Sequence, residues 1–330
     1  MIVFEATRAP AAKASEALAA GRRIAGRLLP YGADADGRFP RFDPLERRFT
    51  VRRHDAVVAV GPADPEIWVE AIGRLPSGPL LVGPGSPAEE VWGAYRAAAT
   101  AALAAGRAVY LLDPDPRGIP EGGGRAAVAL CTWRPGRAFE FPGAAAAGAA
   151  GIAAAAVFPA VPGWTGEAAA LDALAAAAAE AGSVSLTAVA PQTDGESRRA
   201  LVEARADAEP EEADAFFERV HHGAWAEEVP RWLARARAVA LRRGLAVLPP
   251  RPVGRGERAG NAAASARLEE LADARESEEH RAALAHAAVR WIDDAGRDLA
   301  AVAREGNFRK VFPFEKELAE AAEAAFREVG

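Results

Sequence analysis

Two aspartates and a pair of histidines are the side chains of this sequence best suited to acid–base or metal chemistry. Asp113 and Asp115 stand in the stretch LLDPDP, directly after an apolar run, and His221 precedes His222 and a glycine. Carboxylates at a strand end act as general bases or bind hard cations, and histidines move protons near neutral pH. We therefore treat Asp113, Asp115 and His221 as candidate catalytic residues. Two acids among prolines also form a stiff solvated turn, and paired histidines also occur as an exposed or capping pair.

Several loops carry glycine, tryptophan or arginine at places suited to a small ligand. The stretch Gly83-Pro84-Gly85-Ser86 joins an apolar run to a helix-like run. Backbone N–H groups in such turns bind phosphate, although this one has no Walker lysine and also reads as a capped tight turn. Trp133, Arg134 and Trp164 offer surfaces to an anionic or planar ligand, or else cover the core. The candidate ligand-binding residues are Gly83, Gly85, Ser86, Trp133, Arg134, Pro162, Gly163, Trp164, Glu167 and Gln192.

The cysteine count limits the metal chemistry that this chain can perform by itself. Cys131 is the only cysteine, so the sequence has no internal disulfide and cannot build a cysteine-ligated zinc or iron–sulfur site alone. Neither H-E-x-x-H nor G-x-S-x-G occurs. We therefore expect no iron–sulfur cluster, and we assign no metal ligand.

Six short apolar runs, most of them followed by an Ala-rich helical stretch, must position these residues. Continuous apolar strands separated by helices are typical of a parallel sheet that is buried on both faces. In such a sheet, ligands meet the loops at the carboxyl ends of the strands. The expected strands are residues 54–62, 79–83, 107–112, 126–133, 151–159 and 183–190.

Capping signals place the helices. Asp64 before Pro65 predicts a helix start, Ser86 predicts another at about residues 87–105, and Gly106 and Gly182 predict helix ends. From about residue 209 amphipathic helices take over, and residues 248–261 read as a Pro- and Gly-rich loop. The helices expected there are residues 210–220, 226–244, 262–276, 278–304 and 314–329.

One loop resembles a known family of barrel enzymes. Residues 159–167 read PAVPGWTGE, the next helix ends in AAEAG, and the strand SVSLTAVAP follows. This order resembles the later strands of the radical-SAM family, particularly its photolyase-like branch, where P-x-x-P-G follows a late strand. The likeness covers residues 152–191 well and the earlier strand–helix alternation loosely. The family's C-x-x-x-C-x-x-C motif is missing, since Cys131 has no neighbouring cysteine.

The resemblance implies a partial (β/α) barrel whose loop main chain lies against S-adenosylmethionine or another nucleoside. It also implies that the radical chemistry is lost or belongs to another chain. The prolines fix φ in this loop, and Gly163 permits a left-handed backbone or a close approach to a ligand.

Composition excludes several other classes. Half of the residues are hydrophobic, the net charge is −6, and no Lys/Arg stripe forms, so bulk charge gives no support for nucleic-acid binding. The start MIVFEATRAP has no basic and apolar signal regions, and no apolar run is long enough for a membrane span. We expect a cytoplasmic protein, and the Ala, Arg and Gly excess is typical of a high-GC bacterial genome.

The sequence thus predicts an α/β protein with a parallel partial-barrel core, similar to radical-SAM and TIM barrels, and a helical C-terminal region. The expected domains are a strand/helix cap at residues 1–49, the core at 50–207 and the helical region at 208–330. The leading functional hypothesis is a radical-SAM-like protein without a cluster. It either binds a nucleoside-like or anionic small ligand at the strand ends or is the non-catalytic partner of an active subunit. A conventional barrel enzyme using Asp113, Asp115 and His221, and a scaffold protein that binds a partner through its helical region, remain alternatives.

Overall fold

The computed structural model describes most of the chain after residue 39. The described residues are 13–17, 40–43, 48–51, 56–61, 64–75, 80–84, 89–133, 139–159, 161, 163–189, 202–203, 205–207, 209–222, 225–247, 249–255, 259–274, 279–295 and 297–329.

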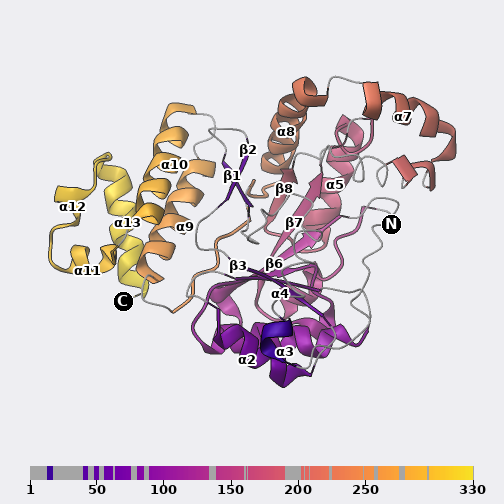
Figure 1. The fold of residues 1–330 in the computed structure, drawn as a ribbon. Helices are drawn as coiled ribbons and strands as arrows, with labels where there is room; N and C mark the ends of the chain where they lie inside the picture. Colours follow the sequence, from indigo (N-terminus) through magenta and orange to yellow (C-terminus); the bar gives the residue numbers. More distant parts are fainter. Residues whose placement is uncertain are drawn as a thin grey trace.

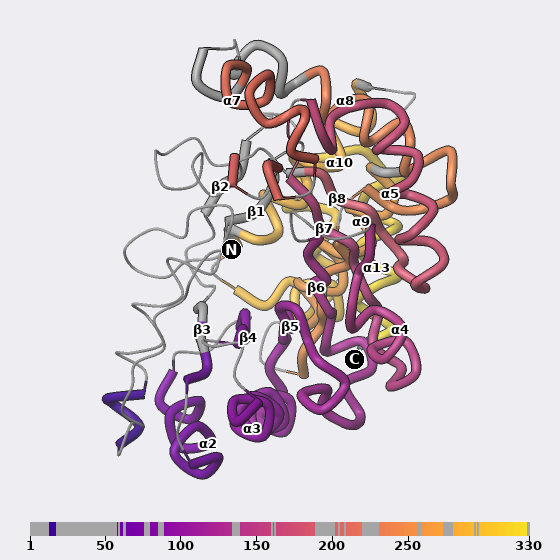
Figure 2. The backbone as a smooth tube through the Cα atoms, turned by 90° about the vertical axis from the view of Figure 1, so that its right-hand side faces the viewer, coloured from indigo at the N-terminus to yellow at the C-terminus, as the bar shows by residue number. Residues whose placement is uncertain are grey.

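Six strands form one parallel sheet in which each strand lies beside the next one in the sequence (Figure 1). Figure 2 shows β3 to β8 following one another across the molecule. Every apolar run that predicted a strand contains one, so the predicted parallel α/β fold is confirmed. The strands are β3 (Ala56–Val60), β4 (Leu80–Pro84), β5 (Val109–Leu112), β6 (Ala127–Thr132), β7 (Ala153–Pro159) and β8 (Ser185–Val189).

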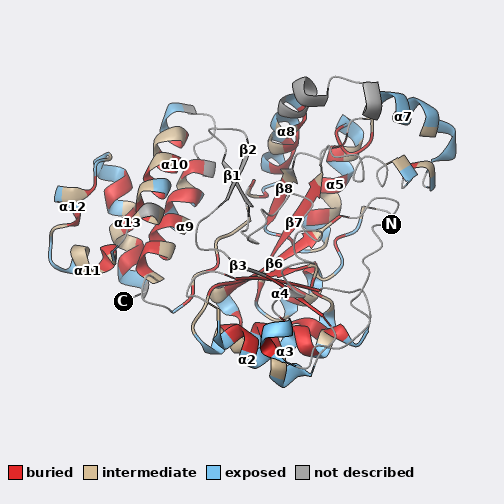
Figure 3. Cartoon of the chain, viewed as in Figure 1, coloured by how far each residue is buried: buried red, intermediate tan, exposed pale blue. Residues whose placement is uncertain are grey.

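The central strands are buried on both faces, which explains why they are written as continuous apolar runs. Every residue of β4 is buried, as are the first five residues of β6. Figure 3 shows this burial continuing from the sheet into the facing sides of the helices around it. Alanine makes up much of β7 and of the helices α3 (Val91–Ala104) and α5 (Ala168–Glu180), so these helices approach the sheet closely. Larger buried side chains, such as Trp68 and Phe158, fill the remaining space.

The helices between the strands begin and end mostly where the capping signals predicted. Helix α2 (Pro65–Gly73) is capped by Asp64, whose carboxylate accepts a hydrogen bond from the N–H of Glu66 at 2.9 Å. Gly106 and Gly182 follow α3 and α5 with φ of 74° and 78°, as expected for helix ends. Helix α3 (Val91–Ala104) begins later than the predicted residue 87, because residues 89–90 form a turn. The other two are α4 (Ala144–Ala149) and α5 (Ala168–Glu180).

The chain continues to build on the sheet beyond β8. Helix α7 (Ala213–His222) follows the short 3-10 turn η3 (Pro210–Glu212), and α8 (Trp225–Arg242) packs against β8 and α5. Ala246 then lies parallel to β8: it accepts a hydrogen bond from the N–H of Leu186 at 2.9 Å and donates to Val184 O at 3.0 Å. Residues 245–247 therefore extend the sheet past β8, which the sequence analysis did not predict.

The last five helices form a second packed group, seen beside the sheet in Figure 1. The single helix predicted at residues 278–304 is two helices, because the chain leaves helical geometry at Ala295 and the Asp298 carboxylate caps a new start by accepting from Ala300 N at 3.0 Å. The short helix α12 was also not predicted. The five are α9 (Ala259–Ala274), α10 (Glu279–Asp294), α11 (Leu299–Arg304), α12 (Phe308–Val311) and α13 (Lys316–Val329).

The segment 249–255 joins this helical group to the amino ends of the strands. Val253 N donates to Arg125 O at 2.8 Å, just before β6, and Arg255 N donates to Gly106 O at 2.6 Å, before β5. A Cβ on Gly254 would lie 2.4 Å from Gly106 O, so this close approach requires glycine. The expected domain boundaries remain predictions, but packing assigns α8 to the sheet and α9 to the second group.

Outside these two groups, β1 (Pro40–Asp43) and β2 (Arg48–Val51) pair as an antiparallel hairpin, which crosses the predicted boundary between the cap at residues 1–49 and the core. In the part of the chain that the structure describes, no helix has the length and apolar character that crossing a membrane requires.

Candidate functional site at the strand ends

Because all six strands are parallel, their carboxyl ends lie at one edge of the sheet. Asp113 directly follows β5, Trp133 directly follows β6, and the loop 159–167 follows β7. Gly83 lies within β4, where it is buried and pairs in register with Ala59. Five predicted site residues fall outside the described residues: Gly85, Ser86, Arg134, Pro162 and Gln192.

Asp113 holds the ends of two strands together. One of its carboxylate oxygens accepts a hydrogen bond from Thr132 N at 2.6 Å, and Thr132 Oγ1 lies 2.7 and 2.6 Å from the two oxygens. The N–H of Asp113 donates to Leu130 O at 2.8 Å. Its φ of 44° is the only positive φ of a non-glycine residue in the described part of the chain. Such a backbone costs about 1–2 kcal/mol, which the bonds to Thr132 offset, so the geometry assigns Asp113 a structural task.

Two groups that interact with the charge of Asp113, the Tyr95 hydroxyl and the Cys131 thiol, are kept uncharged by their surroundings. Tyr95 is buried and its hydroxyl lies 3.2 Å from both Val82 O and Leu112 O. Burial raises the pKa of Tyr95 well above its ordinary value, and the charge of Asp113 raises it further. Burial and Asp113 likewise raise the pKa of the Cys131 thiol. The only thiol of the chain therefore remains protonated and is a poor nucleophile or metal ligand.

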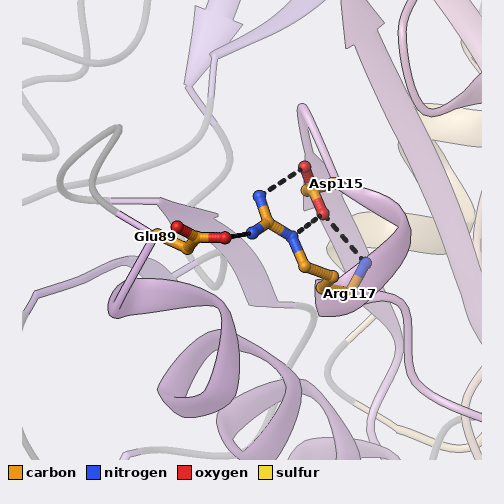
Figure 4. A network of polar contacts seen from close by, with 3 residues as sticks. All are labelled: Glu89, Asp115 and Arg117. Carbon is orange, nitrogen blue, oxygen red and sulfur yellow. Dashed lines mark hydrogen bonds and ion pairs between the residues drawn. The ribbon is translucent and has the colours of Figure 1, made fainter.

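Asp115 belongs to an ion-pair network that joins two loops (Figure 4). It caps the 3-10 turn Pro116–Gly118 by accepting from Arg117 N at 2.9 Å, and it also accepts from Arg117 Nε at 2.7 Å. The Arg117 guanidinium also pairs with Glu89, in the turn before α3. The side-chain hydrogen bond from Arg117 lowers the pKa of Asp115. A carboxylate with a lowered pKa is a weak general base near neutral pH.

Asp113 and Asp115 bond to different partners, and the His221 side chain lies outside the described part of the structure. Asp113 accepts from Thr132 and Asp115 accepts from Arg117, which ties strand ends and loops together. His221 lies in the last turn of α7 and not in a loop. Among the described residues, no three His, Cys, Asp or Glu side chains are grouped so as to hold a metal ion.

The two predicted tryptophans do come together. The ring centroids of Trp133 and Trp164 are 5.1 Å apart with an edge-to-face angle of 86°. Phe139 adds a ring 5.9 Å from Trp133, and Phe216 of α7 adds one 6.1 Å from Trp164. We call these four side chains the aromatic group. Edge-to-face pairs of this kind contribute about 0.5–1.5 kcal/mol beyond the area that they bury.

The loop 159–167 is shaped to bury Trp164. Thr165 is fully buried, and its hydroxyl accepts from Val161 N at 2.8 Å and donates to Pro159 O. Gly166 N donates to Val161 O at 2.8 Å, and a Cβ on Gly166 would lie 3.2 Å from the Trp232 ring. Gly163 has a φ of 68°, and its N–H donates to Glu167 at 3.3 Å. The glycines of this loop thus serve a tight turn and close packing.

An arginine that the sequence analysis missed completes the group. The guanidinium carbon of Arg205 lies 5.1 Å from the centroid of the Trp164 ring, and Arg205 is 4% exposed. Its two terminal nitrogens donate to Glu209 and Glu212 at 2.7 Å each. The helical spacing of these acids, four and seven residues after Arg205, was visible in the sequence. Its contact with Trp164 was not, because that contact depends on how the chain folds back.

Two hydrogen-bond donors of this site have no partner. Trp133 Nε1 and Arg205 Nε are buried, and neither donates to any other described residue. Buried Trp68, by contrast, donates its indole N–H to Gly61 O at 3.1 Å. A buried donor left without an acceptor costs about 1–3 kcal/mol. Two of the five buried side-chain atoms without a hydrogen-bond partner among the described residues therefore belong to residues that contact the Trp164 ring.

The comparisons with known proteins add no relative. No family model matches this chain, and neither the curated proteins nor the solved structures contain a significant match.

Proposed function

We propose that this chain is a radical-SAM-like partial (β/α) barrel without an iron–sulfur cluster, and that it binds a small nucleoside-like ligand at the carboxyl ends of β6 and β7. The observation that carries the proposal is the buried Trp133–Trp164 pair with Arg205 over the Trp164 ring, beside two donors that have no acceptor among the described residues. Planar ligands stack on such rings, and a polar ligand supplies acceptors to the free donors.

The strand order supports the barrel part of the proposal. In a doubly wound sheet the order reverses at a switch point, whereas in a barrel each strand lies beside its sequence neighbour. Here the order runs from β3 to β8 without reversal, and residues 245–247 continue it beyond β8. The helix α8 before that segment packs on β8, as a further β/α unit does.

The chemistry available to the chain is binding and not radical generation. Cys131 is the only cysteine, it is buried, and its pKa is raised, so it does not supply the three thiolates of the family motif. The conventional-enzyme alternative is supported less well, because Asp113 and Asp115 are engaged in strand and loop contacts. A non-catalytic partner of an active subunit fits the same binding site.

Thermal unfolding with added nucleosides tests the proposal. S-adenosylmethionine or adenosine should raise the melting temperature, because a ligand that binds only the native state adds about 2.7 kcal/mol at about 100 times its Kd. Trp164→Leu should abolish the rise. Trp291→Leu removes a tryptophan of the second packed group. This variant should have a lower melting temperature than the wild type, but added nucleoside should still raise that temperature. A wild type that does not respond to either nucleoside, or a Trp164→Leu variant that still responds, contradicts the proposal.

A further inference from the structure

We infer that the group of the ligand that reaches the aromatic group is an uncharged oxygen acceptor, such as an amide carbonyl or a hydroxyl, and not a carboxylate or a phosphate. The inference rests on the proposed binding site and narrows the chemistry of its ligand. The sequence analysis left both a nucleoside-like and an anionic ligand open, and the charges around Arg205 distinguish them.

The positive charge of Arg205 is already more than balanced. Both terminal nitrogens of its guanidinium donate to carboxylates, to Glu209 at 2.7 Å and to Glu212 at 2.7 Å. One guanidinium and two carboxylates leave this cluster with one net negative charge. An anion that approaches Arg205 therefore meets net repulsion, and it also loses its hydration on entering a buried site.

The donors that remain suit a neutral acceptor. Arg205 Nε is the guanidinium nitrogen that neither glutamate occupies, and Trp133 Nε1 belongs to an uncharged indole. Both are buried, and Trp133 is 3% exposed, so only a group that loses little on dehydration can be taken up there at low cost. An amide or hydroxyl oxygen meets this condition and accepts hydrogen bonds from either donor.

The rings set the shape of the group that carries the acceptor. Trp133 and Trp164 lie edge to face, and Phe139 and Phe216 border them. Flat rings pack on aromatic side chains by offset stacking or edge to face. The expected ligand fragment is therefore a planar ring that carries, or is joined to a group that carries, a neutral oxygen acceptor, as the ribose hydroxyls of a nucleoside do.

Benzamide and benzoate form a matched pair of probes, because they share the ring and differ in charge. Each is titrated into the ¹⁵N-labelled full-length protein while the indole N–H resonances are followed. The resonance of Trp133 is assigned as the one missing from Trp133→Phe, and that of Trp291 in the second packed group is the internal reference. We expect benzamide to move the Trp133 resonance and to bind at least about tenfold more tightly than benzoate, with Trp291 unchanged.

Removal of the Glu209 and Glu212 carboxylates should reverse the preference for benzamide over benzoate. The double variant Glu209→Gln, Glu212→Gln keeps side-chain acceptors for Arg205 but frees its positive charge, so benzoate should gain affinity relative to benzamide. The matched control is Glu211→Gln, which removes one exposed charge from the same 3-10 turn, and it should leave the preference as in the wild type.

The outcomes separate the two proposals. If benzoate binds the wild type as well as benzamide does and moves the Trp133 resonance, the ligand site stands and the inference of a neutral acceptor is wrong. If neither probe moves Trp133, both this inference and the binding site at the aromatic group are overturned. An unchanged preference in the double variant contradicts the role given to Glu209 and Glu212.

Discussion

Thr132 donates to the carboxylate of Asp113 from both its backbone N–H, at 2.6 Å, and its hydroxyl, at 2.7 and 2.6 Å from the two oxygens. The residue directly after β5 is thereby fixed to the last residue of β6. The position of Trp133, which follows Thr132, depends on this pair. Asp113, which the sequence offers as a candidate catalytic residue, thus supports the residues from which the candidate site is built.

Replacement of Asp113 should therefore destabilise the fold. Asp113→Ala loses a charged acceptor for two donors and places alanine at a φ of 44°, so we expect the free energy of unfolding to fall by about 2–4 kcal/mol. Asp113→Asn keeps one acceptor oxygen and a side chain that tolerates left-handed geometry, and should lose about 1 kcal/mol. Urea denaturation measures both values. An alanine variant as stable as the wild type shows that the Thr132 contacts contribute nothing.

Asp115 should give the protein a small stability that disappears in acid. Its pKa is lowered in the folded state by Arg117, so its contribution is present above the ordinary value of 3.8 and is lost as the pH falls through the lower folded value. Arg117→Gln removes the partner. The stability difference between wild type and variant should be small at neutral pH, because the pair is at the surface, and should shrink towards zero as the pH falls through the lowered pKa of Asp115. A difference that grows as the pH falls has the wrong sign for this mechanism.

Particular residues show how far the sequence was informative. The six strands were predictable because a buried parallel strand needs a continuous apolar run, and each run here ends at proline, glycine or a polar residue. The segment 245–247 was missed although the printed sequence reads GLAVLPP there, with an apolar run between a helix-ending glycine and two prolines. Its length, shorter than an ordinary strand, hid it.

The candidate site was only partly predictable. Trp133 and Trp164 were found because they stand just past strand ends, which parallel strands bring to one edge. Arg205 was not found, because no local pattern shows that a helical arginine contacts the loop after β7. The reverse holds for Asp113 and Asp115: their positions suggested chemistry, and only the hydrogen bonds to Thr132 and Arg117 showed the structural use.

Arg251 lies in the segment 249–255, which connects the sheet to the last helices, and should be essential to that connection, called the joint below. It is buried, and it donates to Asp293 at 2.6 Å and to Glu269 at 2.8 Å, while Ser265 donates to the same aspartate. Arg251→Met removes the guanidinium that pairs with both carboxylates, and breaking a buried ion pair costs about 3–5 kcal/mol. Arg251→Lys keeps the charge without the two-pronged geometry and should cost less.

Hydrogen exchange shows which helices and strands are destabilised by the loss of Arg251. Amides of α9 and α10 should lose more protection in Arg251→Met than amides of β5 and β6, because the carboxylates and the serine all belong to the second packed group. Arg267→Met is the control, since Arg267 pairs with Glu270 at an exposed position of the same helix. Equal loss of protection in both packed groups means that Arg251 stabilises the chain as a whole and not the joint.

Gly163 should be required for the turn that buries Trp164. Its φ is 68°, and a Cβ placed on it would lie 3.4 Å from the end of the Arg219 side chain, which can move aside. Strain in the backbone, and not lack of space, is thus the main cost of a substitution. We expect Gly163→Ala to lower the free energy of unfolding by about 1–2 kcal/mol and Gly163→Val by more, because β-branched side chains fit this region worst. Gly163→Asn should be the mildest change.

Gly148 supplies the matched control for this last prediction. It lies inside helix α4, where a Cβ would meet nothing within 4 Å and φ is not positive. Gly148→Ala should therefore raise the free energy of unfolding by about 0.5–1 kcal/mol, since alanine is the better helix former. Urea denaturation of the four variants gives the order Gly148→Ala, Gly163→Asn, Gly163→Ala, Gly163→Val from most to least stable. If Gly163→Ala proves neutral while nucleoside protection is lost, the glycine serves ligand approach instead, and the turn is held by Thr165 and Gly166 without it.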